Sequence, residues 1–182
     1  MSLHKKLWIA IIVLLLLVFS GSFLVSTVSA KSYLEQQISM KNADNAAALA
    51  LSLTQQGADD ILLELTLSAQ FDTGFYELIE LRDPEGKLKI LRQDEQPIDQ
   101  APSWFVTAFE INVDAGIATV QSGWQQVGTL TLRSHSKFAY ERLWQSAQML
   151  ALIFLVAMLI SGFLGGQVLK RILKPLDDVV EQ

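Results

Sequence analysis

Two long uncharged runs of hydrophobic residues dominate the pattern of the chain. The first covers 22 positions from Leu7 to Val28, and the second extends from Leu143 to Leu169. A helix needs about 20 consecutive apolar residues to cross a bilayer. We therefore predict transmembrane helices at residues 7–28 and 147–169, with one domain at residues 29–146 between them.

The first part of the intervening segment has a helical pattern. Residues 30–56 follow the first hydrophobic run without a glycine or proline and are rich in strong helix formers, which predicts one long continuous helix. Gly57 is expected to end it. Either Asp59 or Asp60 then opens a second helix, because carboxylates are favourable at the positive end of the helix dipole.

Two pairs of alternating segments predict two β-hairpins. The predicted strands are Phe75–Leu81, a strand through Leu88 and Ile90, Ile117–Ser122 and Val127–Ser134. The sequence Asp83-Pro84-Glu85-Gly86, which is typical of a type I turn, joins the first pair. The stretch SGWQQVG, residues 122–128, joins the second pair.

Helical patterns also lie between the hairpins and after them. Ser103 is expected to cap a short helix that carries Trp104 and Phe105, and from Lys137 a helical pattern continues into the second hydrophobic run. The order helix, helix, strand pair, short helix, strand pair, helix predicts an α+β fold. Such a PAS-like fold places helices on one side of a small antiparallel sheet.

The basic and apolar start of the chain also resembles a signal peptide. His4, Lys5 and Lys6 precede the first run, and residues 26–30 read STVSA, which resembles a cleavage site. The run is longer than the roughly 7–15 apolar residues of a signal peptide. This length favours an uncleaved membrane anchor.

The basic residues that flank the two runs predict the topology. Lys5 and Lys6 precede the first run, and Lys170, Arg171 and Lys174 follow the second. By the positive-inside rule, residues 1–6 and 170–182 then lie in the cytoplasm and the domain lies outside.

The composition excludes several classes of function. Residues 31–146 carry 9 basic and 16 acidic residues, a net charge of −7, so we expect no nucleic-acid binding. The chain has no cysteine, and its two histidines, His4 and His135, are predicted on opposite sides of the membrane. No glycine-rich phosphate loop is present. We therefore expect no enzyme activity, no metal and no organic cofactor.

Small residues in the second hydrophobic run predict a helix contact. Gly162 and Gly166 are four residues apart, a spacing that lets two membrane helices approach closely and pack in a homodimer. Simple tolerance of glycine in a membrane helix is the alternative explanation. We also expect residues 30–56 to contribute to the homodimer.

Trp124 lies at an unusual place for an indole. It follows Gly123 at a predicted strand junction and precedes Gln125 and Gln126, where turns are usually small and polar. An exposed aromatic on a rigid turn is a typical binding anchor. We predict a partner-binding tip at Gly123, Trp124 and Gln125, with burial of Trp124 in the core as the alternative.

The end of the chain and several shorter stretches resemble known families. Residues 170–177, KRILKPLD, resemble the opening of a HAMP linker, in which a proline starts a helix. Several short stretches follow one another over essentially all 182 residues: MSLHKKL, GSF, AAALALSLTQ, FDTGFYELIELRDPEGK, PSWF, SGWQQVG, LTLRSH, LW and LKPLD. Together they resemble the N-terminal part of the LapD family of inner-membrane cyclic-di-GMP receptors, called the LapD/MoxY N-terminal domain.

This resemblance implies a bacterial inner-membrane protein with a PAS-like, dimeric periplasmic domain. In the family this domain binds a periplasmic cysteine protease, LapG, through a tryptophan in the loop that corresponds to Trp124. Sequestering the protease spares a surface adhesin and retains the biofilm. Cyclic-di-GMP would act only through cytoplasmic domains that are absent from these 182 residues.

Two other functions are compatible with the same fold class. A periplasmic sensor domain would bind a small molecule such as a carboxylate, for which Arg82, Arg92 and Arg133 offer cations if they converge. A purely structural dimerisation domain is the third possibility.

Overall fold

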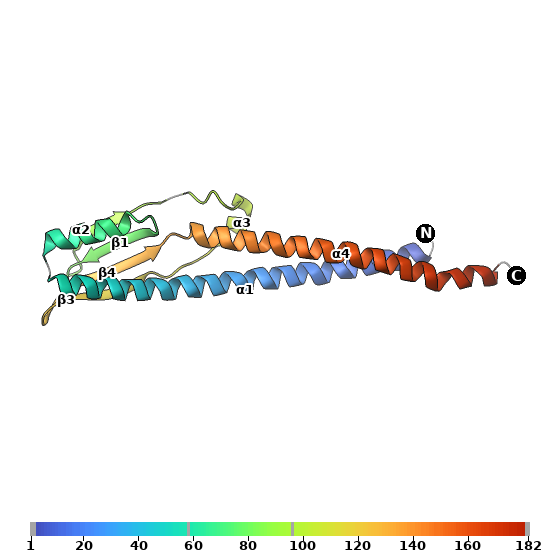
Figure 1. The fold of residues 1–182 in the computed structure, drawn as a ribbon, viewed down its shortest axis with the longest axis horizontal. Helices are drawn as coiled ribbons and strands as arrows, with labels where there is room; N and C mark the ends of the chain where they lie inside the picture. The colour runs from blue at the N-terminus through green and yellow to red at the C-terminus, as the bar shows by residue number, and fades with distance from the viewer. Residues whose placement is uncertain (1–2, 58, 96, 181–182) are drawn as a thin grey trace. The chain divides into compact units, whose positions relative to one another are not determined.

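The computed structural model describes residues 3–57, 59–95 and 97–180. In chain order the elements are α1 (Leu3–Gln56), α2 (Asp60–Phe71), β1 (Tyr76–Arg82), β2 (Leu88–Gln93), α3 (Ser103–Ala108), β3 (Gly116–Ser122), β4 (Gln125–Ser134) and α4 (Lys137–Val180) (Figure 1). The chain divides into a helical unit, Met1–Val28 with Gln145–Gln182, and a sheet unit, Ser29–Trp144.

In the helical unit, segments of α1 and α4 pack against each other through aromatic rings. The rings of Phe19 and Phe154 stack with their centroids 5.4 Å apart. Both helices are long and apolar enough to cross a membrane. The side chains of residues 168–182, where the HAMP-linker start is predicted, and those of His4 and Lys5 lie outside the described residues.

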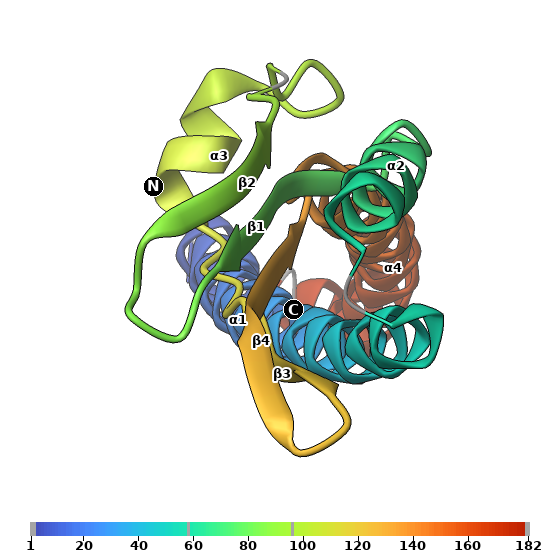
Figure 2. The ribbon, with the colours of Figure 1, turned by 90° about the vertical axis from the view of Figure 1, so that its left-hand side faces the viewer.

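The sheet unit contains four antiparallel strands in the order β2-β1-β4-β3 (Figure 2). Each predicted hairpin is present, and the two hairpins join where β1 pairs with β4, with Leu81 opposite Leu130. The edges of the sheet are therefore β2 and β3. The α+β fold predicted from the order of the elements is confirmed.

Helices α1 and α2 cover the same face of the sheet (Figure 2). The core between them and the strands consists of Ala46, Ala50, Leu53, Leu63, Leu67, Tyr76, Ile79, Leu81, Val120, Leu130 and Leu132. The residues of α1 in this list recur every three or four positions, which is the period of one helix face. Gly116 on β3 lies so close to α1 that a Cβ would stand 2.0 Å from the carbonyl oxygen of Asn42.

Local signals explain where the helices begin and end. Gly57 follows α1 with φ of 69°, a left-handed conformation that favours glycine. The carboxylate of Asp59 then accepts a hydrogen bond from the backbone N–H of Ile61 at 3.0 Å and caps α2. Both residues act as predicted.

Several predicted boundaries are wrong by one or two residues, and β3 begins at Gly116 and not Ile117. Ser103 does not cap α3, because it is the first residue of that helix and follows Pro102, which makes no side-chain capping bond. Strand β1 covers Tyr76–Arg82 and not Phe75–Leu81. Strand β4 begins at Gln125 and not Val127, because the turn before it has only two residues and Ser122 pairs directly with Gln125.

Candidate functional site

The turn between β3 and β4 presents Trp124 to solvent. Gly123 has φ of 60°, so it takes a left-handed conformation that most residues with a Cβ adopt only with strain. Trp124 follows it with a relative exposure of 105%, so the alternative of a buried indole is wrong. Gln125 is also exposed, but it is the first residue of β4 and not part of the turn.

Contacts on both sides hold this hairpin in place. The backbone N–H of Gln121 donates a hydrogen bond to Oγ1 of Thr54 on α1 at 3.1 Å. On the other side, Gly128 packs so closely against β1 that a Cβ would stand 2.2 Å from the carbonyl oxygen of Arg82. Val120 is fully buried between these contacts. The strands therefore support Trp124 on a fixed base.

A fixed, exposed indole has a specific chemical capacity. It offers a large apolar surface with one N–H donor and few rotatable bonds, so little side-chain entropy is lost on docking. The exposed amides of Gln125 and Gln126 follow it in the sequence and offer hydrogen-bond donors and acceptors. Such a tip can insert into an apolar pocket on a partner protein.

Gly162 and Gly166 differ in what an added side chain would meet within the same chain. A Cβ on Gly166 would stand 3.5 Å from Cζ2 of Trp8 on α1 of the same chain, an ordinary van der Waals distance. A Cβ on Gly162 would meet no atom within 4 Å among the described residues. Gly166 therefore faces α1, and the contact of the pair with a second chain stays a prediction.

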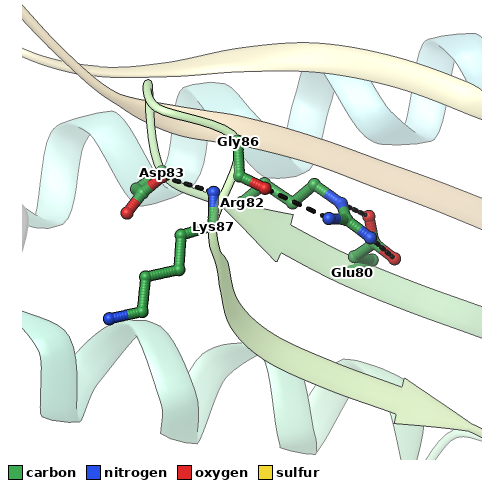
Figure 3. Close-up of polar contacts among 5 residues, drawn as sticks. All are labelled: Glu80, Arg82, Asp83, Gly86 and Lys87. Atoms are coloured by element: carbon green, nitrogen blue, oxygen red, sulfur yellow. Dashed lines mark hydrogen bonds and ion pairs between the residues drawn. The ribbon is translucent and has the colours of Figure 1, made fainter.

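The three arginines considered for a sensor site do not converge. Arg82 bonds both carboxylate oxygens of Glu80 and donates to the carbonyl oxygen of Gly86 at 3.1 Å (Figure 3). The carboxylate of Glu80 raises the pKa of Arg82, so this guanidinium stays charged. The turn beside it is closed by Asp83, whose carboxylate accepts the backbone N–H of Lys87 at 2.7 Å (Figure 3).

The other two arginines are engaged with different elements. Arg92 bonds Glu64 and Ser68 of α2 at 3.2 and 3.1 Å. Arg133 bonds Glu77 of β1 at 3.0 Å. Each cation thus has a carboxylate of the chain as its partner, and the three do not form a common anion site.

Sequence reasoning missed a row of polar side chains on α1 that fixes the segment before β3. Glu35 accepts the backbone N–H of Asn112 at 2.8 Å, and Ser39 accepts that of Asp114 at 3.0 Å. Asn42 donates to the carbonyl oxygen of Asp114 at 2.9 Å. A signal was present, because these polar residues share one helix face with the apolar core positions that follow.

Comparison with known proteins links the sheet unit to one family. The family model described as the LapD/MoxY periplasmic domain matches residues 23–144. Among solved structures, the chain is similar to the LapD periplasmic domain of Pseudomonas fluorescens, with 34% sequence identity and a TM-score of 0.39. The similarity covers 68% of this chain and 98% of that chain. No curated protein sequence matches.

Proposed function

The chain belongs to the LapD/MoxY periplasmic domain family, and we propose from this that it captures a LapG-like cysteine protease in the periplasm. Membership makes the sheet unit a periplasmic signalling domain of a membrane receptor, flanked by two helices apolar enough to span the inner membrane. Holding the protease would spare a surface adhesin and retain the biofilm. Cyclic-di-GMP would control this capture through cytoplasmic domains outside these 182 residues.

The exposure of Trp124 is the observation that carries the proposal. A free protein gains nothing from a fully exposed indole on a rigid two-residue turn, whereas a partner pocket that covers it gains about 2 kcal/mol or more. In the proposed complex, Trp124 inserts into the protease, Gly123 permits the turn, and Gln125 bonds at the edge of the contact.

The proposed topology places both ends of the chain in the cytoplasm. The cations that flank the two apolar runs favour this orientation, and the sheet unit then faces the periplasm. A reporter that is active only in the periplasm is expected to work when inserted at Gln96 and to be silent after Gln182. Both insertion points lie outside the described residues. The reverse pattern of activity would contradict the proposed orientation.

The proposed assembly is a homodimer with the Ala30–Gln56 part of α1 in the contact. A Cβ on Gly162 would meet no atom within 4 Å among the described residues of its own chain, which leaves room there for a second α4, whereas Gly166 faces Trp8. Light scattering of the full chain in detergent checks the dimer. A strict monomer at all accessible concentrations would contradict it.

The decisive experiment compares two charged substitutions on one hairpin. Trp124→Glu is expected to weaken capture of a purified LapG-like protease by at least about 30-fold, the equivalent of about 2 kcal/mol. Ile117→Glu is the matched control, because Ile117 is 67% exposed on β3 and lies at the opposite end of the hairpin. It is expected to bind like the native chain. Equal binding by Trp124→Glu and the native chain would refute the proposal.

A further inference from the structure

The short helix α3 buries one aromatic residue and exposes the next. Phe105 is 1% exposed and packs against Trp144 of α4 with ring centroids 4.9 Å apart. Trp104 is 64% exposed, although its ring contacts Trp144 edge-on at 5.8 Å. A soluble fold has no need to leave this indole half in water beside a second tryptophan.

Hydrogen bonds fix the segment after α3 to both long helices. The backbone N–H of Ile111 donates to the hydroxyl of Tyr140 on α4 at 2.8 Å. The next backbone N–H, that of Asn112, donates to Glu35 on α1 at 2.8 Å. Through this segment, α3 is therefore attached to both α1 and α4.

These attachment points lie next to the predicted membrane spans. Glu35 follows Val28 by seven residues, which is about 10 Å along a helix, and Trp144 precedes residue 147 by three, about 5 Å. Thr54, which holds the Trp124 hairpin, follows Val28 by 26 residues, or about 39 Å. Trp104 and Trp124 thus lie at opposite ends of the sheet unit.

The aromatic residues near the spans have the chemistry of a membrane interface. Tryptophan and tyrosine concentrate at the headgroup level, where the ring leaves water and the N–H or O–H stays hydrated. Tyr33, five residues after Val28, is 65% exposed on α1. Lys31 lies two residues before it and forms an ion pair with Glu35 at 3.5 Å.

We propose that Tyr33, Trp104 and Trp144 form an interfacial belt that rests in the outer headgroup layer of the membrane. Trp104 is the member that lies on α3, whereas Tyr33 and Trp144 lie on the two helices that continue into the predicted spans. The belt holds the base of the sheet unit against the lipid and leaves the Trp124 end in water. This inference depends on the predicted spans and not on capture of a protease.

Fluorescence quenching in lipid vesicles tests the belt with the full chain. The chain has four tryptophans, at positions 8, 104, 124 and 144, and substitution of three by phenylalanine leaves one reporter at a time. In phosphatidylcholine vesicles, brominated lipids are expected to quench the Trp104 reporter strongly and to leave the Trp124 reporter unaffected. Acrylamide, which stays in the aqueous phase, is expected to quench the Trp124 reporter more strongly than the Trp104 reporter.

The Trp8 reporter separates failure of the belt from failure of the spans. Brominated lipid should quench Trp8 if α1 crosses the bilayer. If Trp8 is quenched while Trp104 behaves like Trp124, the belt is refuted and the spans stand. If neither is quenched, the spans and the belt are both refuted. Capture of a protease is measured separately and does not decide either outcome.

A second measurement keeps the other tryptophans intact. Because the chain has no cysteine, Trp104→Cys and Trp124→Cys each accept a single nitroxide label without further changes. Oxygen, which dissolves in lipid, is expected to relax the label at position 104 more than a water-soluble nickel chelate does. The label at 124 is expected to prefer the nickel chelate. Equal behaviour of the two labels would overturn the proposal.

Discussion

Ser134 donates two hydrogen bonds to the side-chain oxygen of Asn42, one from its hydroxyl at 2.6 Å and one from its backbone N–H at 3.2 Å. The amide nitrogen of Asn42 donates in turn to the carbonyl oxygen of Asp114. Asn42 is fully buried, so these bonds replace water that cannot enter. One side chain of α1 thus holds both the segment before β3 and the end of β4.

Substitution of Asn42 should therefore destabilise the sheet unit. Asn42→Leu keeps a similar volume but removes the side-chain amide that bonds Ser134 and Asp114. The expected loss is about 2 kcal/mol or more in the free energy of unfolding. Urea unfolding of residues 29–146, followed by circular dichroism, measures it. Lys41→Leu, at the exposed neighbouring position, is the control and should change little.

Two glycines on β3 and its turn should respond to substitution for different reasons. Gly116→Ala places a Cβ against the backbone of α1 and is expected to cost about 2 kcal/mol or more. Gly123→Ala meets open space but strains a positive φ, at about 1 kcal/mol. Asparagine tolerates that φ, so Gly123→Asn should recover stability, whereas Gly116→Asn should not. Recovery at both positions would contradict the close approach at Gly116.

Two large aromatic residues of the sheet unit should differ sharply in their contribution to stability. Phe105→Ala removes a ring that is 1% exposed and is expected to cost about 3–5 kcal/mol. Trp124→Ala removes a fully exposed ring, and the free energy of unfolding should stay within about 0.5 kcal/mol of native. Denaturant unfolding of both variants decides this. A large loss for Trp124→Ala would mean that the indole packs against the domain.

His135 should make the stability of the sheet unit depend on pH. Its side chain is 4% exposed, and its Nε2 has no hydrogen-bond partner among the described residues. Burial and the nearby Lys137 lower the pKa of His135 below its ordinary value of about 6.5, against the opposing effect of Glu77 and Asp94.

The sign of this dependence follows from proton binding. Below about pH 6.5 the imidazole of His135 is protonated in the unfolded chain but still neutral in the folded chain. The free energy of unfolding therefore falls as the pH falls towards the lowered pKa. Stability is fully present above about pH 6.5. The melting temperature should decrease between about pH 7.5 and 5.5, a range above the ordinary carboxylate pKa values. His135→Gln should flatten this decrease, and an unchanged slope would exclude His135 as its source.

The individual helices and hairpins could be predicted because each carries a local signal. Gly57 and Asp59 end one helix and open the next through their own backbone preference and capping oxygen. The exposure of Trp124 followed from its place between Gly123 and Gln125. These signals act over a few residues, so they can be recognised without knowledge of the rest of the fold.

The arrangement of the hairpins could not be predicted in the same way. Pairing of β1 with β4 brings Leu81 to Leu130, and nothing in either strand alone selects this neighbour. The selection comes from the shared core beneath α1 and α2, which is a property of all the elements together. The role of Asn42 was hidden for the same reason, since its partners lie about 70 to 90 positions away.

The two edges of the sheet differ in a way that affects how the molecules behave when they are concentrated. The backbone N–H of Gln121 on β3 bonds a side chain of α1, and a Cβ on Gly116 of β3 would meet the backbone of α1, so α1 covers part of that edge. The outer edge of β2 has no strand partner among the described residues. An open edge is a template for sheet growth between molecules. Strand β2 has only six residues and carries Lys89 and Arg92, and this brevity and charge discourage fibril growth from the side that the fold leaves open.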